Sequence, residues 1–246
     1  VSSLPLPEMM RSEGKTVEGI VQIAGIRSPG EARMILGAGA DWLGFPLRLE
    51  HHGEDLPDKE VAALIASLGI GDRAVLITYL ERAPEILALA GALGCRRVQL
   101  HGDIAAEETH RLRETGTGLF LIKALIVRPG NPDELIGRIR EFGPLVDAFI
   151  TDTWDPQTGA RGATGKTHDW DVSRRIVEES TRPVILAGGL TPVNVARAID
   201  RVRPAGVDAH TGVEAPDGMK APALVGAFVG EARRAFALLK GNPFGR

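Results

Sequence analysis

Short apolar runs recur eight times along this 246-residue chain, and segments with helical signals separate them. The runs are rich in Val, Ile or Leu and lack strict apolar–polar alternation, which is typical of parallel strands buried on both faces. They span 20–24, 41–47, 73–80, 97–101, 119–125, 147–152, 183–188 and 205–210. Eight strands alternating with about eight helices predict an α/β protein, a single parallel (β/α)8 TIM barrel.

An open, doubly wound sheet is the main alternative to this barrel. Such sheets usually have about five or six strands and often carry a glycine-rich loop after the first. Here the first run is followed by AGIRSPGE, and the number of runs is higher, so the barrel is favoured. We expect the barrel domain over residues 20–246. Residues 1–19 have no sustained period and are expected to form an N-terminal extension.

Helix signals lie between the runs. Ser28-Pro29-Gly30-Glu31 is a capping box with proline at the first helical position, and Asn131-Pro132-Asp133-Glu134 repeats it. Thr191-Pro192 is expected to open a third helix in the same way. Three glycines are expected to end helices in the left-handed conformation, namely Gly69, Gly94 and Gly116.

The overall composition excludes several classes of protein. A net charge of −3 gives no electrostatic footprint for nucleic acid or a membrane surface. A single cysteine, Cys95, excludes a disulfide framework and a multi-cysteine zinc site. No apolar run approaches the roughly 18 residues of a membrane span. We therefore expect a cytoplasmic protein of enzyme size.

Polar residues and glycines stand near the carboxyl ends of the predicted strands, where the chemistry of a (β/α)8 barrel takes place. Packing alone would not require them. They are Arg48, Thr78, Tyr79, His101, Lys123, Asp152, Gly188, Gly189, Asp208 and His210. We therefore expect the functional site at this end of the barrel.

A series of sequence stretches points to one family. They are GADWLGF (39–45), VQLHG (98–102), IKAL (122–125), TDT (151–153), GATGKTHDW (162–170), ILAGGLTPVNVARAI (185–199) and VRPAGVDAHTGVEAPDGMK (202–220). In order and spacing they resemble phosphoribosylanthranilate isomerase, a (β/α)8 enzyme of the tryptophan pathway. The resemblance covers nearly the whole predicted barrel, and its glycine-rich second half is the most specific part.

The resemblance implies where the substrate phosphate binds. In the family the loops after strands seven and eight hold it, which corresponds here to Gly188, Gly189, Thr211 and Gly212, with help from Gly165. The glycines themselves support a phosphate site, because residues without a side chain let backbone N–H groups approach an anion closely. The alternative is that these glycines only form tight turns.

The resemblance also implies a general acid. In the family it is the aspartate that closes strand six, and Asp152 stands at that position. An aspartate can protonate a ring oxygen if burial raises its pKa toward the working pH. The alternative is a strand-end or helix-cap role.

Two family features are absent from this chain. The family's general base is a cysteine in a KICG motif of the first strand, and the matching QIAG places Ala24 there. The family also holds the anthranilate carboxylate with an arginine in the loop after strand two. That loop reads RLEHHGED here, with Arg48 earlier than the family arginine and His52 near its position. We keep Arg48, His52 and His101 as candidate substrate-binding residues.

Several groups compete to replace the missing thiol. His210 stands where the family has a serine, at the end of strand eight beside strand one, and its ordinary pKa near 6.5 suits a base. Cys95 precedes strand four, at the opposite face. His110 and His168 are expected on a helix surface or loop. His51 and His52 with nearby acids lack regular metal-ligand spacing, so no metal is expected.

A nucleotide site is also excluded. The stretch GARGATGKT (159–167) does not fit the P-loop pattern GxxxxGK[ST], because Ala160 stands where the first glycine belongs. The stretch falls instead within the glycine-rich loop of the resembled family.

Three functions remain open from the sequence. The first is an aldose–ketose isomerase of the phosphoribosylanthranilate type, without a cofactor, in which Asp152 is the acid and His210 the base; its substrate or turnover would be altered unless another group replaces the thiol. The second is a lyase or aldolase that forms a Schiff base through Lys123. The third is a non-catalytic sugar-phosphate-binding protein. In each case the partner is a phosphorylated small molecule, and the chain is expected to be a monomer or homodimer.

Overall fold

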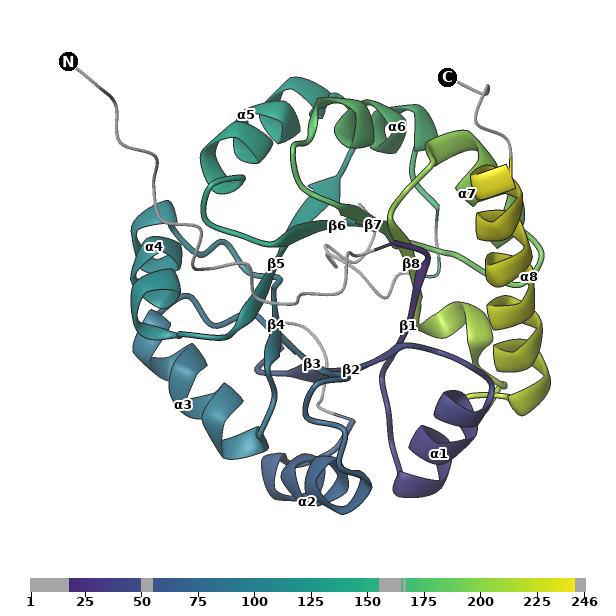
Figure 1. The fold of residues 1–246 in the computed structure, drawn as a ribbon, viewed down its shortest axis with the longest axis horizontal. Coiled ribbons are helices and arrows are strands. Elements are labelled where there is room, and N and C mark those ends of the chain that lie inside the picture. The colour runs from purple at the N-terminus through teal and green to yellow at the C-terminus, as the bar shows by residue number, and fades with distance from the viewer. Residues whose placement is uncertain (1–17, 50–54, 155–164, 166, 242–246) are drawn as a thin grey trace.

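The computed structural model describes residues 18–49, 55–154, 165 and 167–241. Within these residues eight parallel strands close a barrel in chain order, and β8 pairs with β1 to complete the ring (Figure 1). The strands are β1 (Ile20–Ala24), β2 (Trp42–Leu47), β3 (Ala74–Thr78), β4 (Arg97–Leu100), β5 (Phe120–Val127), β6 (Ala148–Thr153), β7 (Val184–Leu186) and β8 (Gly206–Ala209). The predicted (β/α)8 barrel is confirmed.

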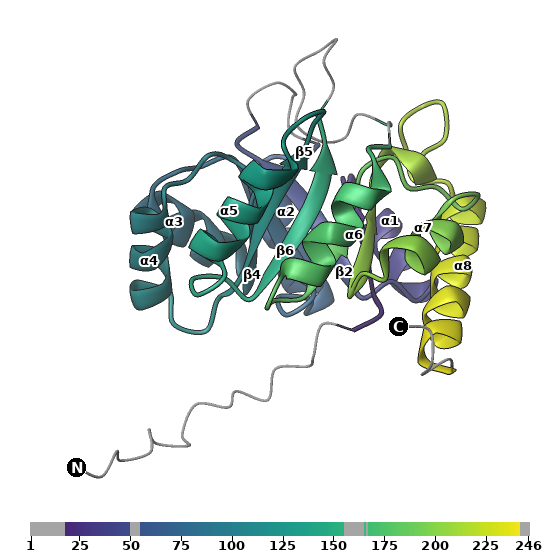
Figure 2. The same ribbon diagram turned by 90° about the horizontal axis from the view of Figure 1, so that it is seen from above.

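Helices follow the strands and form the outer ring of Figure 1. They are α1 (Pro29–Gly37), α2 (Asp58–Leu68), α3 (Ala83–Leu93), α4 (Ala106–Thr115), α5 (Pro132–Phe142), α6 (Trp170–Glu179), α7 (Val195–Val202) and α8 (Pro222–Gly241), with a short 3-10 helix, η1 (Thr211–Val213), after β8. In the view of Figure 2 the strands run obliquely between the helices, and the arrowheads of β5 and β6 point to the same end of the barrel.

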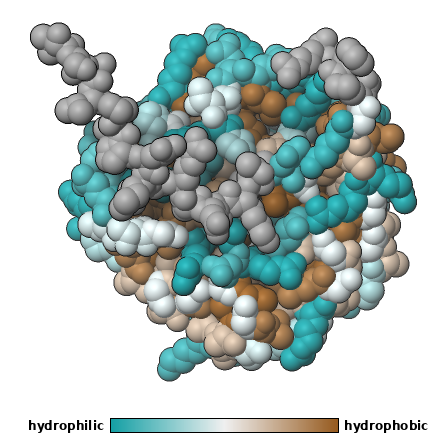
Figure 3. Space-filling model, in the orientation of Figure 1, coloured by the Kyte–Doolittle hydropathy of each residue, from teal (hydrophilic) through white to brown (hydrophobic). Residues whose placement is uncertain are grey.

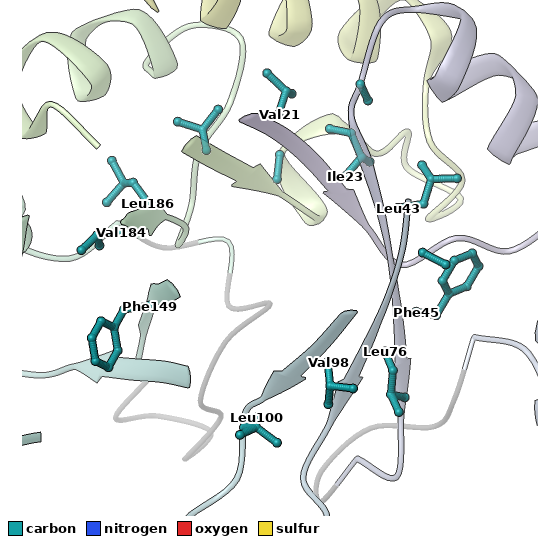
Figure 4. Close-up of a cluster of buried hydrophobic side chains, with 14 of the residues drawn as sticks. Val21, Ile23, Leu43, Phe45, Leu76, Val98, Leu100, Phe149, Val184 and Leu186 are labelled. Carbon is teal, nitrogen blue, oxygen red and sulfur yellow. The ribbon is translucent and has the colours of Figure 1, made fainter. Parts of the chain in front are cut away.

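Alternate residues of each strand face two different cores. Outward side chains, such as Val21, Ile23 and Phe149, pack between strands and helices (Figure 4). Inward ones form a second, smaller cluster inside the barrel that includes Ala24 and Ile150. Whether a strand residue faces inward or outward therefore decides whether its side chain can reach the barrel mouth, the opening at the carboxyl ends of the strands.

Aromatic residues and an arginine close the amino-terminal end of the barrel. The Trp42 and Phe120 rings lie 5.8 Å apart, edge to face, and the Arg97 guanidinium lies 4.9 Å from the Trp42 ring. Burial lowers the pKa of Arg97. A ligand must therefore enter the barrel from the carboxyl ends of the strands.

The local helix signals are mostly confirmed. Ser28 Oγ accepts the Glu31 N–H at 3.1 Å, and Glu31 Oε2 accepts the Arg27 N–H at 2.6 Å, one residue before the expected partner. α5 begins at Pro132 after its N-cap Asn131, as predicted, but no capping box forms there, because Asn131 Oδ1 accepts the Arg128 N–H instead. Gly69 and Gly94 end α2 and α3 in the left-handed conformation.

Two local expectations are wrong. Thr191-Pro192 does not open a helix, because Asn194 accepts the Thr191 N–H and donates to Gly189 O, forming a tight turn that delays α7 to Val195. Gly116 is not left-handed, with φ −90°. Its N–H donates to Leu112 O, and a Cβ at Gly116 would lie 2.7 Å from that oxygen, so a close approach explains the glycine.

Hydrophilic side chains project around the outer edge of the molecule in Figure 3, as expected for the outward faces of the helices. Among the described helices, including the 20-residue α8, none combines the length and the apolar character that crossing a membrane requires.

Candidate active site

Asp152 lies at the end of β6 and faces into the barrel, two residues after the inward Ile150. Its side chain is only 13% exposed. Burial raises its pKa to about 7, against the opposing effect of the Thr153 N–H, which donates to Oδ1 at 2.7 Å. An aspartate in this environment holds a proton near neutral pH and can donate it to a ligand.

A chain of polar side chains crosses the barrel interior to Asp152. Gln22 Nε2 donates to Gln99 Oε1 at 3.3 Å, and Gln99 Nε2 lies 3.1 Å from His101 Nδ1. Because the Gln99 oxygen already accepts from Gln22, its amide nitrogen donates to Nδ1. The proton of neutral His101 therefore sits on Nε2, which lies 3.9 Å from Asp152 Oδ2.

A second carboxylate, Asp208 of β8, lies in the same interior. It pairs in register with Gln22 of β1, and its Oδ1 is buried with no hydrogen-bond partner among the described residues. Burial, together with the charge of Asp152, raises the pKa of Asp208 to about 7. The two aspartates thus form an interacting pair in which ionisation of one disfavours ionisation of the other.

His210 directly follows β8, and its side chain reaches across to the end of β1, next to the position of the missing thiol. Its imidazole packs over Gly25, where any Cβ would overlap the ring. The preceding residue, Ala24, faces inward and belongs to the inner apolar cluster. His210 Nε2 lies 3.4 Å from Glu214 Oε1, and that carboxylate also accepts from Lys220 Nζ at 2.6 Å. Glu214 therefore holds the imidazole in place.

The glycine-bearing loops after β6, β7 and β8 come together. A Cβ on Gly212 would overlap Leu190 O, and a Cβ on Gly165 would lie 3.5 Å from Thr211 Oγ1. Gly188 and Gly189 have φ of 92° and 61°, and neither donates a backbone hydrogen bond within the described residues. Unused N–H groups on closely approaching loops suit an anion such as phosphate.

Comparison with known proteins decides the family. Residues 73–231 match the family model described as N-(5'phosphoribosyl)anthranilate (PRA) isomerase. The chain belongs to the PRA isomerase family. It is 38% identical to N-(5'-phosphoribosyl)anthranilate isomerase 2 of Methanosarcina mazei over 88% of this chain and 95% of the relative, and 37% identical to the Haloferax volcanii isomerase over 87% and 93%.

Solved PRA isomerase structures agree with this assignment. The Thermococcus kodakaraensis enzyme is 31% identical, with a TM-score of 0.71 over 87% of this chain and 98% of that one. A PRA isomerase in complex with reduced 1-(o-carboxyphenylamino)-1-deoxyribulose 5-phosphate also has a TM-score of 0.71, at 26% identity and the same coverage. The resemblance found in the sequence motifs is confirmed.

Some candidates do not join this PRA isomerase site. Lys123 faces out of the barrel wall, between the outward Leu121 and Leu125, and its Nζ donates to Leu100 O, Gly102 O and Ala124 O at 2.8–3.3 Å. These bonds stabilise the ammonium form, which favours a structural role over a Schiff base. Arg48 has a left-handed φ of 59° and makes two hydrogen bonds to Asp58, the first residue of α2.

Three other titratable residues lie in the parts of the fold that the sequence predicts, before β4, on a helix surface and in a loop. Burial raises the pKa of Cys95 to about 12, so this thiol before β4 is unsuited to base catalysis. His110 is exposed on α4 and pairs with Glu114. His168 is in a loop but buried between Thr153 and Ser173, which lowers its pKa to about 4. His51 and His52 lie outside the described residues. No group of three metal-ligating side chains occurs in the described part of the chain.

Three residues of this site were not predicted from the sequence: Gln22, Gln99 and Glu214. Gln22 and Gln99 are 77 residues apart, and only barrel closure brings them together. A polar residue within an otherwise apolar run was the available signal for both of them. Glu214 lies four residues after His210, a spacing that allows contact within one turn.

Proposed function

We propose that this chain converts N-(5'-phosphoribosyl)anthranilate to 1-(o-carboxyphenylamino)-1-deoxyribulose 5-phosphate, with Asp152 as general acid and His210 as general base. The observation that carries the proposal is the His210–Glu214 pair seated over Gly25, beside the Ala24 position from which the family's thiol is missing. Its supports are membership of the family and the buried, proton-holding Asp152.

The first step opens the ribose ring. Protonated Asp152 gives its proton to the ring oxygen while the bond from that oxygen to C1 breaks. The nitrogen lone pair forms a C1=N double bond, so the intermediate is a protonated imine and Asp152 becomes a carboxylate. His101, with its proton on Nε2, faces this carboxylate and stabilises its charge.

The second step removes the proton on C2. His210 takes it, the electrons of the C2–H bond form a C1=C2 double bond, and the imine electrons return to nitrogen. The resulting enaminol becomes the ketone when the C2 hydroxyl loses its proton and C1 gains one. These steps are redox-neutral proton transfers, so the mechanism calls for no cofactor. Glu214 stabilises the imidazolium that forms on His210.

Binding of the phosphate fixes the sugar over these groups. We assign it to the backbone of Gly188, Gly189, Thr211 and Gly212, which is supported by the two glycines whose N–H groups are unused in the described residues. Holding the far end of the substrate places C1 and C2 between Asp152 and His210. We expect the enzyme to act in the cytoplasm as a monomer or homodimer.

Steady-state turnover of N-(5'-phosphoribosyl)anthranilate by the unmodified chain tests the proposal. Turnover within the ordinary range of about 1–10³ s⁻¹ would mean that another group has replaced the thiol. Tight binding of the reduced product analogue without any turnover would contradict catalysis and favour a binding protein.

A further inference from the structure

The proposed substrate carries a second anion, the carboxylate of its anthranilate ring. The resemblance places an arginine for it in the loop after β2, and this chain has no arginine there beyond Arg48. An aromatic carboxylate left without a cation or donors would lose affinity and orientation. A cation on another loop at the same end of the barrel is the alternative.

Arg27 stands three residues after the end of β1, where three loops meet. Its Nε donates to Asp55 Oδ1 at 2.9 Å, from the loop that leads into α2. Its Nη1 packs against Gly218 of the loop after β8, where a Cβ would lie 2.7 Å away. Gly218 has a φ of 79°, so a residue without a side chain is suited to both the backbone shape and the contact.

The terminal nitrogens of Arg27 remain available. In the described part of the chain the only hydrogen bond of this guanidinium is the one from Nε to Asp55. The side chain is 37% exposed. Nη1 and Nη2 together present the geometry that binds a carboxylate through two parallel hydrogen bonds, while Asp55 fixes the plane of the group.

Arg27 and the proposed base are linked through one acidic residue, Glu214. The pKa of Arg27 is raised chiefly by the hydrogen bond to Asp55, and the charge of Glu214 contributes. Because Glu214 contacts His210 at 3.4 Å, the guanidinium and the proposed base share one carboxylate neighbour. A ring attached to C1 would lie near C2 and hence near His210, within reach of this loop.

Other described cations at this end of the barrel have partners of their own. Arg82 lies 3.7 Å from Glu85, and Arg128 donates to Glu134 at 2.7 Å. Arg48 makes two hydrogen bonds to Asp58. Lys220 has a fully buried side chain that pairs with Glu214. Lys123 lies on the outer side of the barrel wall, with its Nζ donating to backbone carbonyls.

We propose that Arg27, held by Asp55, binds the anthranilate carboxylate and so replaces the missing arginine of the loop after β2. This inference rests on the proposed function and adds a specificity-determining residue to it. It predicts that the enzyme distinguishes ligands with the ring carboxylate from those without it, and that Arg27 is the source of the distinction.

The test compares two ligands and three proteins. The ligands are the reduced product analogue and the same compound lacking the ring carboxylate. The proteins are the unmodified chain, Arg27→Met, and Arg33→Met as a matched control, since Arg33 is an exposed arginine on neighbouring α1. A charge-assisted pair is worth about 1.5–3 kcal/mol, or about 10–100-fold in affinity. We expect the unmodified chain and Arg33→Met to prefer the carboxylate ligand by that factor, and Arg27→Met to bind both equally.

Steady-state kinetics and a second substitution at Arg27 test the inference further. Arg27→Met should raise KM for the substrate with a smaller change in kcat, and Arg27→Lys should retain part of the preference while losing the paired hydrogen bonds. A full preference in folded Arg27→Met and Arg27→Lys would overturn the inference, as would its loss in Arg48→Met instead. Failure of the proposed function would look different, because the unmodified chain would then turn over no substrate.

Discussion

The two sides of the barrel mouth differ in how closely they keep to the family pattern. The β6–β8 side has the aspartate and the glycine loops that the motifs predict, at Asp152, Gly188 and Gly189. The β1–β2 side has Ala24 in place of the thiol and a loop without the expected arginine. Under the proposed function, the side assigned to the sugar phosphate keeps the family pattern, while the side assigned to C2 and the ring carries different residues.

Under the proposed function, the β1–β2 side takes its groups from neighbouring loops. His210 reaches over Gly25 from β8, and Arg27 lies between Asp55 and Gly218. In a closed barrel the ends of β8, β1 and β2 are adjacent, so one loop can supply a group that another has lost. Function can thus persist when an individual motif residue does not.

The largest effect is expected on the β6–β8 side, from Asp152→Asn. The amide retains the shape of the carboxyl group but cannot give a proton to the ring oxygen, so kcat should fall by about 10²–10⁴-fold. The measurement is steady-state turnover, with affinity for the reduced product analogue as the check on folding. A loss below tenfold would remove Asp152 as the acid.

The unmodified enzyme should also lose activity at high pH. Asp152 must be protonated to act, and its pKa is about 7, so kcat/KM should fall about tenfold per pH unit above that value. A profile that stays flat to pH 9 would contradict the assignment of Asp152 as acid.

A smaller effect is expected from Gly189→Val, which adds a β-branched side chain at a φ of 61°. Loss of one or two N–H contacts to phosphate should weaken binding of the reduced product analogue by about 10–100-fold. Gly118→Val is the control, because Gly118 has a similar left-handed φ with nothing within 4 Å of an added Cβ, in the turn before β5. Equal affinities in the two folded variants would place the phosphate elsewhere.

A further effect concerns stability rather than turnover or binding, through Asp208→Asn. The folded-state pKa of Asp208 is raised from 3.8 to about 7, so the protonated form is favoured and stability is lost as pH rises from about 4 to 7. Asparagine has no such ionisation and can donate to Gln22 Oε1, which is unpartnered among the described residues. We expect the variant to be about 4 kcal/mol more stable than the unmodified chain at pH 8, with little difference in this charge effect at pH 4. Denaturant unfolding at both pH values measures it; a difference that does not change with pH would exclude Asp208 ionisation as its cause.

The barrel could be predicted from the sequence because each buried strand is a separate short apolar run. Helix starts were less certain. Ser28 caps α1 as its motif indicates, whereas Asn194 builds a turn that overrides Thr191-Pro192. Asp152 and the glycines were found because their motifs survive. Gln22, Gln99 and Glu214 were not found, because their contacts arise only when the barrel closes.

Residue parity explains the failure of one candidate. Lys123 stands in a strand near other site residues, but its outward position places Nζ on backbone carbonyls and 5.8 Å from the Phe142 ring, away from the barrel mouth. Gln22 and Gln99 have the opposite parity and so join the interior chain to His101. The presence of a polar residue in a strand therefore did not show whether its side chain faces into or out of the barrel.

The most direct measurement of the central claim, that His210 replaces the thiol missing at Ala24, is a four-way comparison of turnover. The proteins are the unmodified chain, His210→Ala, Ala24→Cys and the double variant. We expect His210→Ala to lower kcat by about 10²–10⁴-fold, and Ala24→Cys in that background to recover part of the loss, since a thiol then occupies the family position. Full turnover in folded His210→Ala would contradict the account.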